Sequence, residues 1–187
     1  MSSTRGSYSL HSLRRRPHFY GLREAKGDLV GFALFDRLEE QLQRRPELRE
    51  YRWKRREIEN YLCSQETLLA YADACARELA LGGPLFEAAD RERRMETMRQ
   101  CIQDYVPQAA LRDSNYRWWL DTKVSDEFLD VLFESFFQKL NLPNLMRKTD
   151  YHVLARHVPR ASIDPEVSEV LDMIVEVADH AHPLREE

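Results

Sequence analysis

Apolar residues follow one another without a break from Leu29 to Phe35. A strand with one solvated face would alternate apolar and polar residues. The continuous run therefore predicts a strand buried on both faces, as in a parallel or mixed sheet covered by helices. Asp36 follows directly. It would lie at the carboxyl end of this strand, where ligand-binding groups gather in open α/β sheets, unless it only caps a turn or pairs with Arg37.

A second, shorter strand is predicted from 48 to 53, where side chains alternate between two faces and Tyr51 shares a face with Trp53. The charged stretch 38–47, which contains Pro46, predicts a loop or a short exposed helix. The second strand would bring Glu57 to the same edge of the sheet as Asp36.

Two conformations are open for the segment that follows, Glu57 to Leu62. As a helical turn, it would direct Ile58, Tyr61 and Leu62 inward and leave Glu57 and Asn60 together on the other face. As an extended segment, it would align the side chains at 57, 59 and 61. We favour the helical turn.

From residue 64 onward, apolar residues recur at the intervals of three and four that are typical of helices. The pattern predicts helices over 64–80, 85–105, 123–140 and 144–158, and a last helix that begins at Pro165 after a capping Asp164. The stretch 123–140 is the most regular, with a core-facing stripe of Phe128, Leu129, Leu132, Phe133, Phe136, Phe137 and Leu140. The last helix is predicted to face the core with Val167, Val170, Leu171, Ile174, Val177 and Ala178.

These elements predict a helix-rich α/β fold, in which a small partial sheet is followed by an all-helical C-terminal part. Three regions are expected. Residues 1–17, rich in Ser, Arg and Gly, form a flexible basic N-terminus. Residues 18–83 contain both strands, and residues 84–187 form a helical part packed on them as one globular unit.

Composition restricts the function classes. The 187 residues are 43% hydrophobic, which is enough for a real core, and the net charge of −4 gives the molecule no overall basic field for nucleic acid. No apolar run reaches the ~20 residues of a membrane span and no secretory signal is recognisable, so we expect a cytoplasmic protein without a membrane partner. The three cysteines lack metal-ligand or disulfide spacing and are expected to be buried thiols.

Charged residues supply the candidate chemistry. The sequence has no G-x-x-x-x-G-K-[ST], so no ATP site is expected in this chain. The cluster of Arg52, Lys54, Arg55 and Arg56 is either a solvated face or an edge that contacts phosphates. Carboxylates that suit Mg²⁺ or Mn²⁺ occur at Asp36, Glu39, Glu40, Glu57 and Glu59.

A buried strand ending in Asp36, followed by Trp53-Lys54-Arg55-Arg56-Glu57-Ile58-Glu59-Asn60-Tyr61-Leu62, resembles the C-terminal TOPRIM-like region of bacterial OLD-family proteins. Those proteins join an ABC-type AAA ATPase to a TOPRIM nuclease-like domain. The segments Asn141-Leu142-Pro143-Asn144-Leu145 and Asp150-Tyr151-His152-Val153-Leu154-Ala155 are similar to the helical tail of the same ATPases. The resemblance covers residues 20–178 and implies that the two strands form a partial TOPRIM-like sheet.

The resemblance also implies roles for individual residues. Asp36 takes the place of the first acid of the family's D-x-D motif, and Glu57 that of the acid in R-E-I-E-N-Y-L. The resemblance implies that Asp36 and Glu57 are catalytic and bind Mg²⁺, and that Glu59 is a further metal ligand. The nucleic-acid contacts would come from Arg37, Lys54, Arg55 and Arg56. The chain departs from the pattern at Leu38, which stands where the second acid of D-x-D is expected, and no strand with a glutamate precedes Leu29.

Three hypotheses follow. In the first, the chain is a TOPRIM-like domain with weak or no independent nuclease activity that works with an ATPase subunit or parent chain. In the second, it is an active Mg²⁺-dependent DNA nuclease. In the third, it is a non-catalytic interaction module that binds a partner or a second copy. In this third hypothesis Asp36 and Glu57 pair with Arg37, Arg55 or Arg56, and an exposed apolar patch near Trp118 and Trp119 marks the partner surface.

Overall fold

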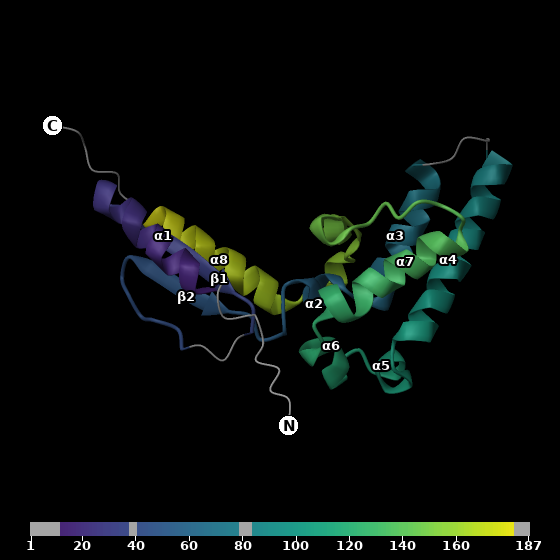
Figure 1. Ribbon diagram of the computed structural model, residues 1–187, viewed down its shortest axis with the longest axis horizontal. Helices are drawn as coiled ribbons and strands as arrows, with labels where there is room; N and C mark the ends of the chain where they lie inside the picture. The colour runs from purple at the N-terminus through teal and green to yellow at the C-terminus, as the bar shows by residue number, and fades with distance from the viewer. Residues whose placement is uncertain (1–11, 38–40, 79–83, 182–187) are drawn as a thin grey trace, which may run out of the picture. The chain divides into compact units, whose positions relative to one another are not determined.

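The computed structural model describes residues 12–37, 41–78 and 84–181 (Figure 1). They divide into two compact units. Unit 1 contains the described residues up to Arg52 together with those from Pro165 onward, and unit 2 is Trp53–Asp164. This division differs from the predicted boundaries after residues 17 and 83, because the C-terminal helix packs with the sheet. Residues 12–17, expected to be flexible, belong to a helix, and residues 1–11 lie outside the described part of the chain.

Unit 1 is built around a two-stranded parallel sheet. Strand β1 (Gly31–Phe35) pairs with β2 (Leu48–Arg52), in a register that aligns Gly31 with Leu48 and Phe35 with Arg52. Both strands lie where the hydrophobic pattern places them, and the helix-rich α/β fold with a small partial sheet is confirmed. In the described part of the connection, residues 41–47 form a loop.

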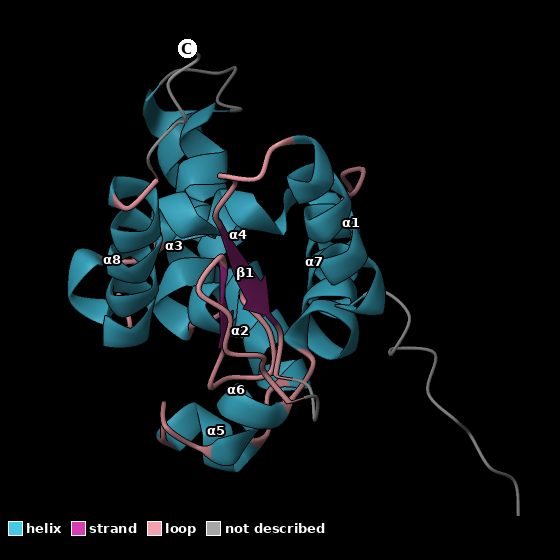
Figure 2. Ribbon diagram, turned by 90° about the vertical axis from the view of Figure 1, so that its left-hand side faces the viewer, coloured by secondary structure: helices cyan, strands magenta, loops and turns pink. Residues whose placement is uncertain are grey.

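Helices α1 (Ser12–Ala25) and α8 (Pro165–Asp179) cover opposite faces of this sheet (Figure 2). The alternation of β2 explains the arrangement, because successive side chains of a strand point to opposite faces. Arg49 and Tyr51 reach α8, where they bind Glu176 (2.5 Å) and Glu166 (2.9 Å). Glu50, between them, faces α1. The continuous apolar pattern of β1 therefore reflects a strand that lies between two helical layers.

A paired charge holds α1 on the sheet. The guanidinium of Arg16 donates two hydrogen bonds to the Glu50 carboxylate, at 2.6 and 2.8 Å, and the backbone N–H of Gln43 donates a third at 2.7 Å. The Glu50 side chain is only 1% exposed. Burial on its own raises the pKa of Glu50, but the Arg16 guanidinium and the Gln43 N–H outweigh it and leave the pKa below its ordinary value.

The apolar core of unit 1 is small. Among its described residues, the buried apolar side chains are Phe35, Leu48 and Val170. Leu171 and Ile174, predicted to face the core from the last helix, are instead 57% and 39% exposed. Helix α8 is apolar around much of its circumference, so its sequence pattern does not single out the face that packs on the sheet.

The regular secondary structure in the described part of unit 2 is entirely helical. Its elements are α2 (Glu59–Leu62), α3 (Gln65–Glu78), α4 (Pro84–Tyr105), α5 (Gln108–Arg112), α6 (Arg117–Asp121), the π-helical turn η1 (Ser125–Leu129), α7 (Asp130–Lys139) and the 3₁₀ segments η2 (Lys148–His157) and η3 (Arg160–Ser162). The turn η1 runs directly into α7, so the two together form the predicted helix over 123–140.

The core of unit 2 forms around η1 and α7. All seven residues of the predicted stripe, from Phe128 to Leu140, are buried, which confirms that prediction. The ring of Phe133 contacts Tyr71 of α3 edge-on, with ring centroids 5.3 Å apart, and stacks on Tyr151 of η2, with ring centroids 5.9 Å apart. Trp119 is also buried and lies edge-on to Trp118 and Phe128. Trp119 is therefore part of the core, and Trp118 is half-buried against it.

No helix in the described ranges is both long and apolar enough to span a membrane.

Replacing Glu50 by Gln tests how far unit 1 depends on its buried ion pair. We expect Glu50→Gln to lower the stability of unit 1 by about 2–3 kcal/mol at neutral pH, because Arg16 loses its charged acceptor. In the unaltered chain this contribution is complete above the ordinary glutamate pKa of about 4.5 and is lost as the pH falls through the lowered folded-state pKa. Amide hydrogen exchange of β1 and β2 as a function of pH measures the effect.

Glu176→Gln is the matched control, because the Arg49–Glu176 pair is exposed on both sides and should contribute little. Equal losses in the two variants, or the same acid dependence in Glu50→Gln as in the unaltered chain, would contradict this role of the Arg16–Glu50 pair.

Candidate functional site

Glu57 is the most deeply buried of the predicted site residues, with 4% exposure. Its carboxylate lies at the start of η1. One carboxylate oxygen accepts a hydrogen bond from the Ser125 backbone N–H at 2.6 Å, and the other accepts one from the Ser125 hydroxyl at 3.0 Å. The first N–H groups of a helix have no partner inside the helix, and a negative charge is favourable there. The contact therefore provides hydrogen-bond donors for the buried carboxylate and an acceptor for the Ser125 N–H at the start of the core helix.

Asn60, 1% exposed, fixes the backbone around Glu57. Its side-chain oxygen accepts a hydrogen bond from the Glu57 N–H at 3.0 Å. Its amide nitrogen donates to the carbonyl oxygens of Trp119 (2.8 Å) and Thr122 (3.0 Å), in the segment that leads to Ser125. Both polar atoms of the Asn60 side chain are thus used to join two segments about sixty residues apart.

Arg55 completes this polar cluster. Its guanidinium donates to the Asn60 carbonyl at 2.9 Å and to the Asp164 carboxylate at 2.6 Å, and it lies 4.7 Å from the centre of the Tyr61 ring. The Arg55 backbone N–H donates to the Tyr61 hydroxyl at 3.1 Å. Arg55, predicted to contact nucleic acid, is therefore held inside unit 2 by a carboxylate and an aromatic ring.

The burial of this segment matches its predicted pattern at Tyr61, which is buried, but not at three other residues. The helical turn is confirmed as α2, but Ile58 is 45% exposed while Glu57 and Asn60 are buried. The expected inward position of Ile58 is wrong, because the hydrogen bonds to Ser125, Trp119 and Thr122 draw the polar side chains inward. Sequence spacing does not reveal these partners, which lie 59 to 68 residues away along the chain.

The other predicted site residues are placed as follows. In unit 1, Asp36 is exposed at the carboxyl end of β1, as the sequence predicts, and Arg37 beside it is half-buried. In unit 2, Lys54 is exposed, Arg56 is half-buried, and Glu59, the first residue of α2, is half-buried. Asp36 and Glu57 thus belong to different compact units, so the predicted pair of metal-binding acids does not lie within one unit.

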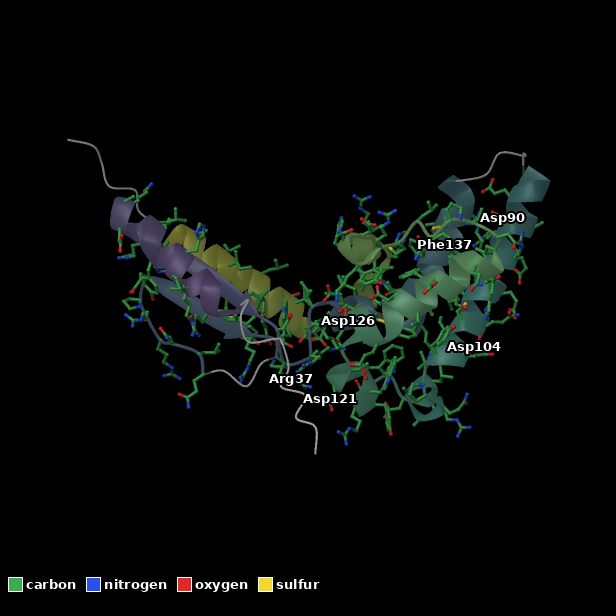
Figure 3. The ribbon with its side chains drawn as sticks, viewed as in Figure 1. Arg37, Asp90, Asp104, Asp121, Asp126 and Phe137 are labelled. Carbon is green, nitrogen blue, oxygen red and sulfur yellow. The ribbon has the colours of Figure 1, made fainter. Side chains whose placement is uncertain are left out.

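Several acidic side chains of unit 2, on different elements, are paired with basic side chains. Asp90, Asp104, Asp121 and Asp126, labelled in Figure 3, pair with Arg94, Lys139, Arg117 and two lysines, Lys123 and Lys148, respectively. Hydrogen bonds from these two lysines hold the pKa of Asp126 below its ordinary value. Within the described ranges, no three His, Cys, Asp or Glu side chains are grouped closely enough to hold a metal ion.

A polar pocket of about 310 Å³ opens beside the Arg55 cluster. Its lining includes Arg55, Asn60, Gln65, Asn115 and Asp164.

Sequence reasoning missed Ser125 as a partner of Glu57 and assigned Asp164 only as a helix cap. The available signal was the position of Ser125 at the beginning of the strongest helical pattern, where a buried acid is a suitable partner.

Cys63 lines the same pocket and is buried. Burial raises the pKa of its thiol, and the nearby Glu57 carboxylate raises that pKa further. A thiol in these surroundings is not a nucleophile. The three cysteines are all free, with Cys63 and Cys101 buried as expected for small apolar side chains.

Comparison of the chain with protein-family models, with curated proteins and with solved structures found no match.

Removing the Glu57 carboxylate should destabilise unit 2. We expect Glu57→Ala to cost about 2–4 kcal/mol, because the Ser125 N–H and hydroxyl lose a charged acceptor in a buried position. All three tryptophans lie in unit 2, so denaturant unfolding followed by tryptophan fluorescence measures the change. The double variant, Glu57→Ala with Ser125→Ala, should lose less stability than the sum of the losses in the two single variants, because the residues share one interaction.

The control is Glu134→Ala, which removes an exposed acid from α7 and should change stability by about 0.5 kcal/mol or less. A Glu57→Ala variant as stable as Glu134→Ala would show that the carboxylate does not hold the start of η1.

Proposed function

We propose that this chain is a cytoplasmic TOPRIM-like domain, similar to the C-terminal part of OLD-family ATPases, with weak or no nuclease activity of its own. It works with an ATPase partner or with a parent chain that carries the ATPase. One observation supports the weak or absent nuclease activity: both carboxylate oxygens of Glu57 accept hydrogen bonds from Ser125.

A catalytic metal ligand needs an oxygen lone pair directed at a site that the metal and the substrate can reach. Glu57 is buried, and both of its oxygens accept hydrogen bonds at 3.0 Å or less. Binding a cation through Glu57 would break the contact at the start of η1 and expose a side chain that the core encloses. These features support a structural role for Glu57 in the segment that resembles the family.

The position of Asp36 supports the TOPRIM-like part of the proposal. It lies exposed after a parallel strand that is covered by a helix on each face, which is the location where α/β domains place ligand-binding groups. The residue two positions later is Leu38, so the chain does not repeat the acid there. In the proposed arrangement, further acids for Mg²⁺ would come from the partner or parent chain.

The alternative is a Mg²⁺-dependent DNA nuclease, and the exposure of Asp36 is the observation that favours it. In that case Asp36 binds the ion, and the exposed Lys54 is one candidate contact to DNA phosphates.

A nicking assay on supercoiled DNA distinguishes the two. We expect the purified chain with Mg²⁺ or Mn²⁺ to cleave DNA no faster than the Asp36→Ala variant, because one exposed carboxylate does not hold two catalytic metal ions. Glu57→Gln, which keeps the size of the side chain, serves as the second comparison. Cleavage that requires the metal and falls at least tenfold in Asp36→Ala, with unchanged folding by circular dichroism, would establish the nuclease and overturn the proposal.

The ATPase partnership has its own test. We expect affinity-tagged chain, expressed in its own cells, to co-purify with a P-loop ATPase, and the purified chain to change the ATP hydrolysis rate of that protein at least twofold. The chain alone should hydrolyse no ATP, since it has no phosphate-binding loop. If no captured ATPase responds to the purified chain, the partnership with a separate ATPase subunit is wrong.

A further inference from the structure

Strand β1 has the sequence of a buried strand and lies at an edge of the sheet. Its residues, Gly31 to Phe35, are uncharged and predominantly apolar, whereas β2 contains the charged residues Arg49, Glu50 and Arg52. Uninterrupted apolar strands are typical of parallel sheets that helices cover on both faces, as α1 and α8 cover this one. In the described part of the chain, β1 has one neighbour, β2. The burial of both faces thus leaves β1 with an uncharged edge.

A groove lies beside β1, on the side of the sheet that α1 covers. All five residues of the strand line this groove, together with Leu48 and with Arg16 and Phe19 of α1, and its volume is about 360 Å³. Gly31 and Phe35 are on the face of the sheet that contacts Phe19 and Arg16 of α1, so the groove lies between α1 and β1. Successive residues of a strand point to opposite faces, and the lining also includes Phe32 and Leu34, so the groove reaches the edge of β1.

The hydrogen-bond ladder identifies which backbone groups point into that edge. The N–H of Gly31 donates to the Glu47 carbonyl at 2.9 Å, across the β1–β2 pair. In a parallel ladder, every second residue of a strand bonds to the same neighbour. Gly31, Ala33 and Phe35 thus face β2, and the peptide N–H and C=O groups of Phe32 and Leu34 turn toward the groove.

This edge lacks the charges and prolines that protect many exposed edges from pairing. Natural edge strands carry lysines, prolines or inward-pointing charges that discourage the approach of another strand. The stretch from Leu29 to Phe35 contains no charge and no proline, and its side chains are half-buried or buried. An edge of this kind is suited to pairing.

We propose that β1 binds a third β-strand, uncharged and rich in aliphatic residues, that a different polypeptide supplies. The incoming strand would pair with the N–H and C=O groups of Phe32 and Leu34 and fill the groove beside Phe19. It would make β1 the central strand and enlarge the small apolar core of unit 1. This binding surface does not depend on the nuclease or ATPase role discussed above.

The charges of the covering helices favour a different polypeptide over a second copy of this chain. Helix α1 contains four arginines and one glutamate, a net of +3, whereas α8 contains five acids and no lysine or arginine. Two copies paired through β1 about a twofold axis would place α1 beside α1 on one face and α8 beside α8 on the other. Like charges would then oppose each other on both faces of the sheet.

The probe for the test is a short synthetic peptide of alternating valine and isoleucine with an uncharged polyethylene glycol tail. Its control is the same peptide N-methylated at every residue, which cannot donate backbone hydrogen bonds. We expect the full chain to bind the unmodified peptide at least tenfold more tightly by fluorescence anisotropy. Binding should also slow hydrogen exchange of the Phe32 and Leu34 amides at least tenfold, because those amides become paired.

A substitution in the chain gives an independent result. Leu34→Pro removes an N–H that faces the groove and leaves the bonds of β1 to β2 in place, so peptide binding should weaken at least tenfold. Leu171→Gln, on the exposed side of α8, should bind as the unaltered chain does. If Leu34→Pro fails to fold, the methylated peptide and the amide exchange decide the question.

Three outcomes overturn the proposal. They are absence of peptide binding, equal binding of the methylated peptide, and a dimer of the unaltered chain that Leu34→Pro or an excess of peptide dissociates. The last would show that a second copy fills the groove.

Discussion

A buried carboxylate at the beginning of a helix is the contact on which unit 2 depends. Placing an ionised glutamate inside a protein is costly unless hydrogen bonds replace its water. Ser125 supplies two such bonds to Glu57, and Asn60 ties the same segment to the carbonyls of Trp119 and Thr122. Because these bonds lead directly into η1 and α7, the polar cluster sets where the aromatic core of the unit begins.

Unit 1 is held together in a different way. Three buried apolar side chains are few for a three-layer arrangement, and polar contacts on both faces of β2 supplement them. Glu50 joins the sheet to α1, while Arg49 and Tyr51 join it to α8. The C-terminal helix thus belongs with strands that precede it by more than a hundred residues. A sheet of this size, with an unprotected strand at one edge, is consistent with the binding of a further strand.

The different surroundings of Glu57 and Asp36 affect what the resemblance to OLD-family proteins implies about function. The segment that carries the resemblance, Arg56 to Leu62, is used in this chain to connect elements of unit 2, and its acid is enclosed. The exposed acid, Asp36, belongs to unit 1. A motif can therefore retain its residues because the fold requires their hydrogen bonds, whether or not they also served a metal. The proposal of a domain that depends on a partner is based on this distinction.

Local patterns determined much of the fold. The position of β1 follows from an unbroken apolar run and that of β2 from alternation between two faces. The long helix through Phe128 and Phe137 follows from a spacing of three and four, and all these patterns depend on neighbouring residues alone. The position of Asp36 at the carboxyl end of a strand followed in the same way.

Tertiary structure alone decided the rest. The inward position of Glu57 and the outward position of Ile58 depend on a serine 68 residues away, which no local pattern reveals. The face of α8 that packs on the sheet was equally undetermined, because Val170 and Leu171 are both apolar and only the position of the strands selects between them. Sequence periodicity specifies which elements form, whereas long-range partners decide which side chains they bury.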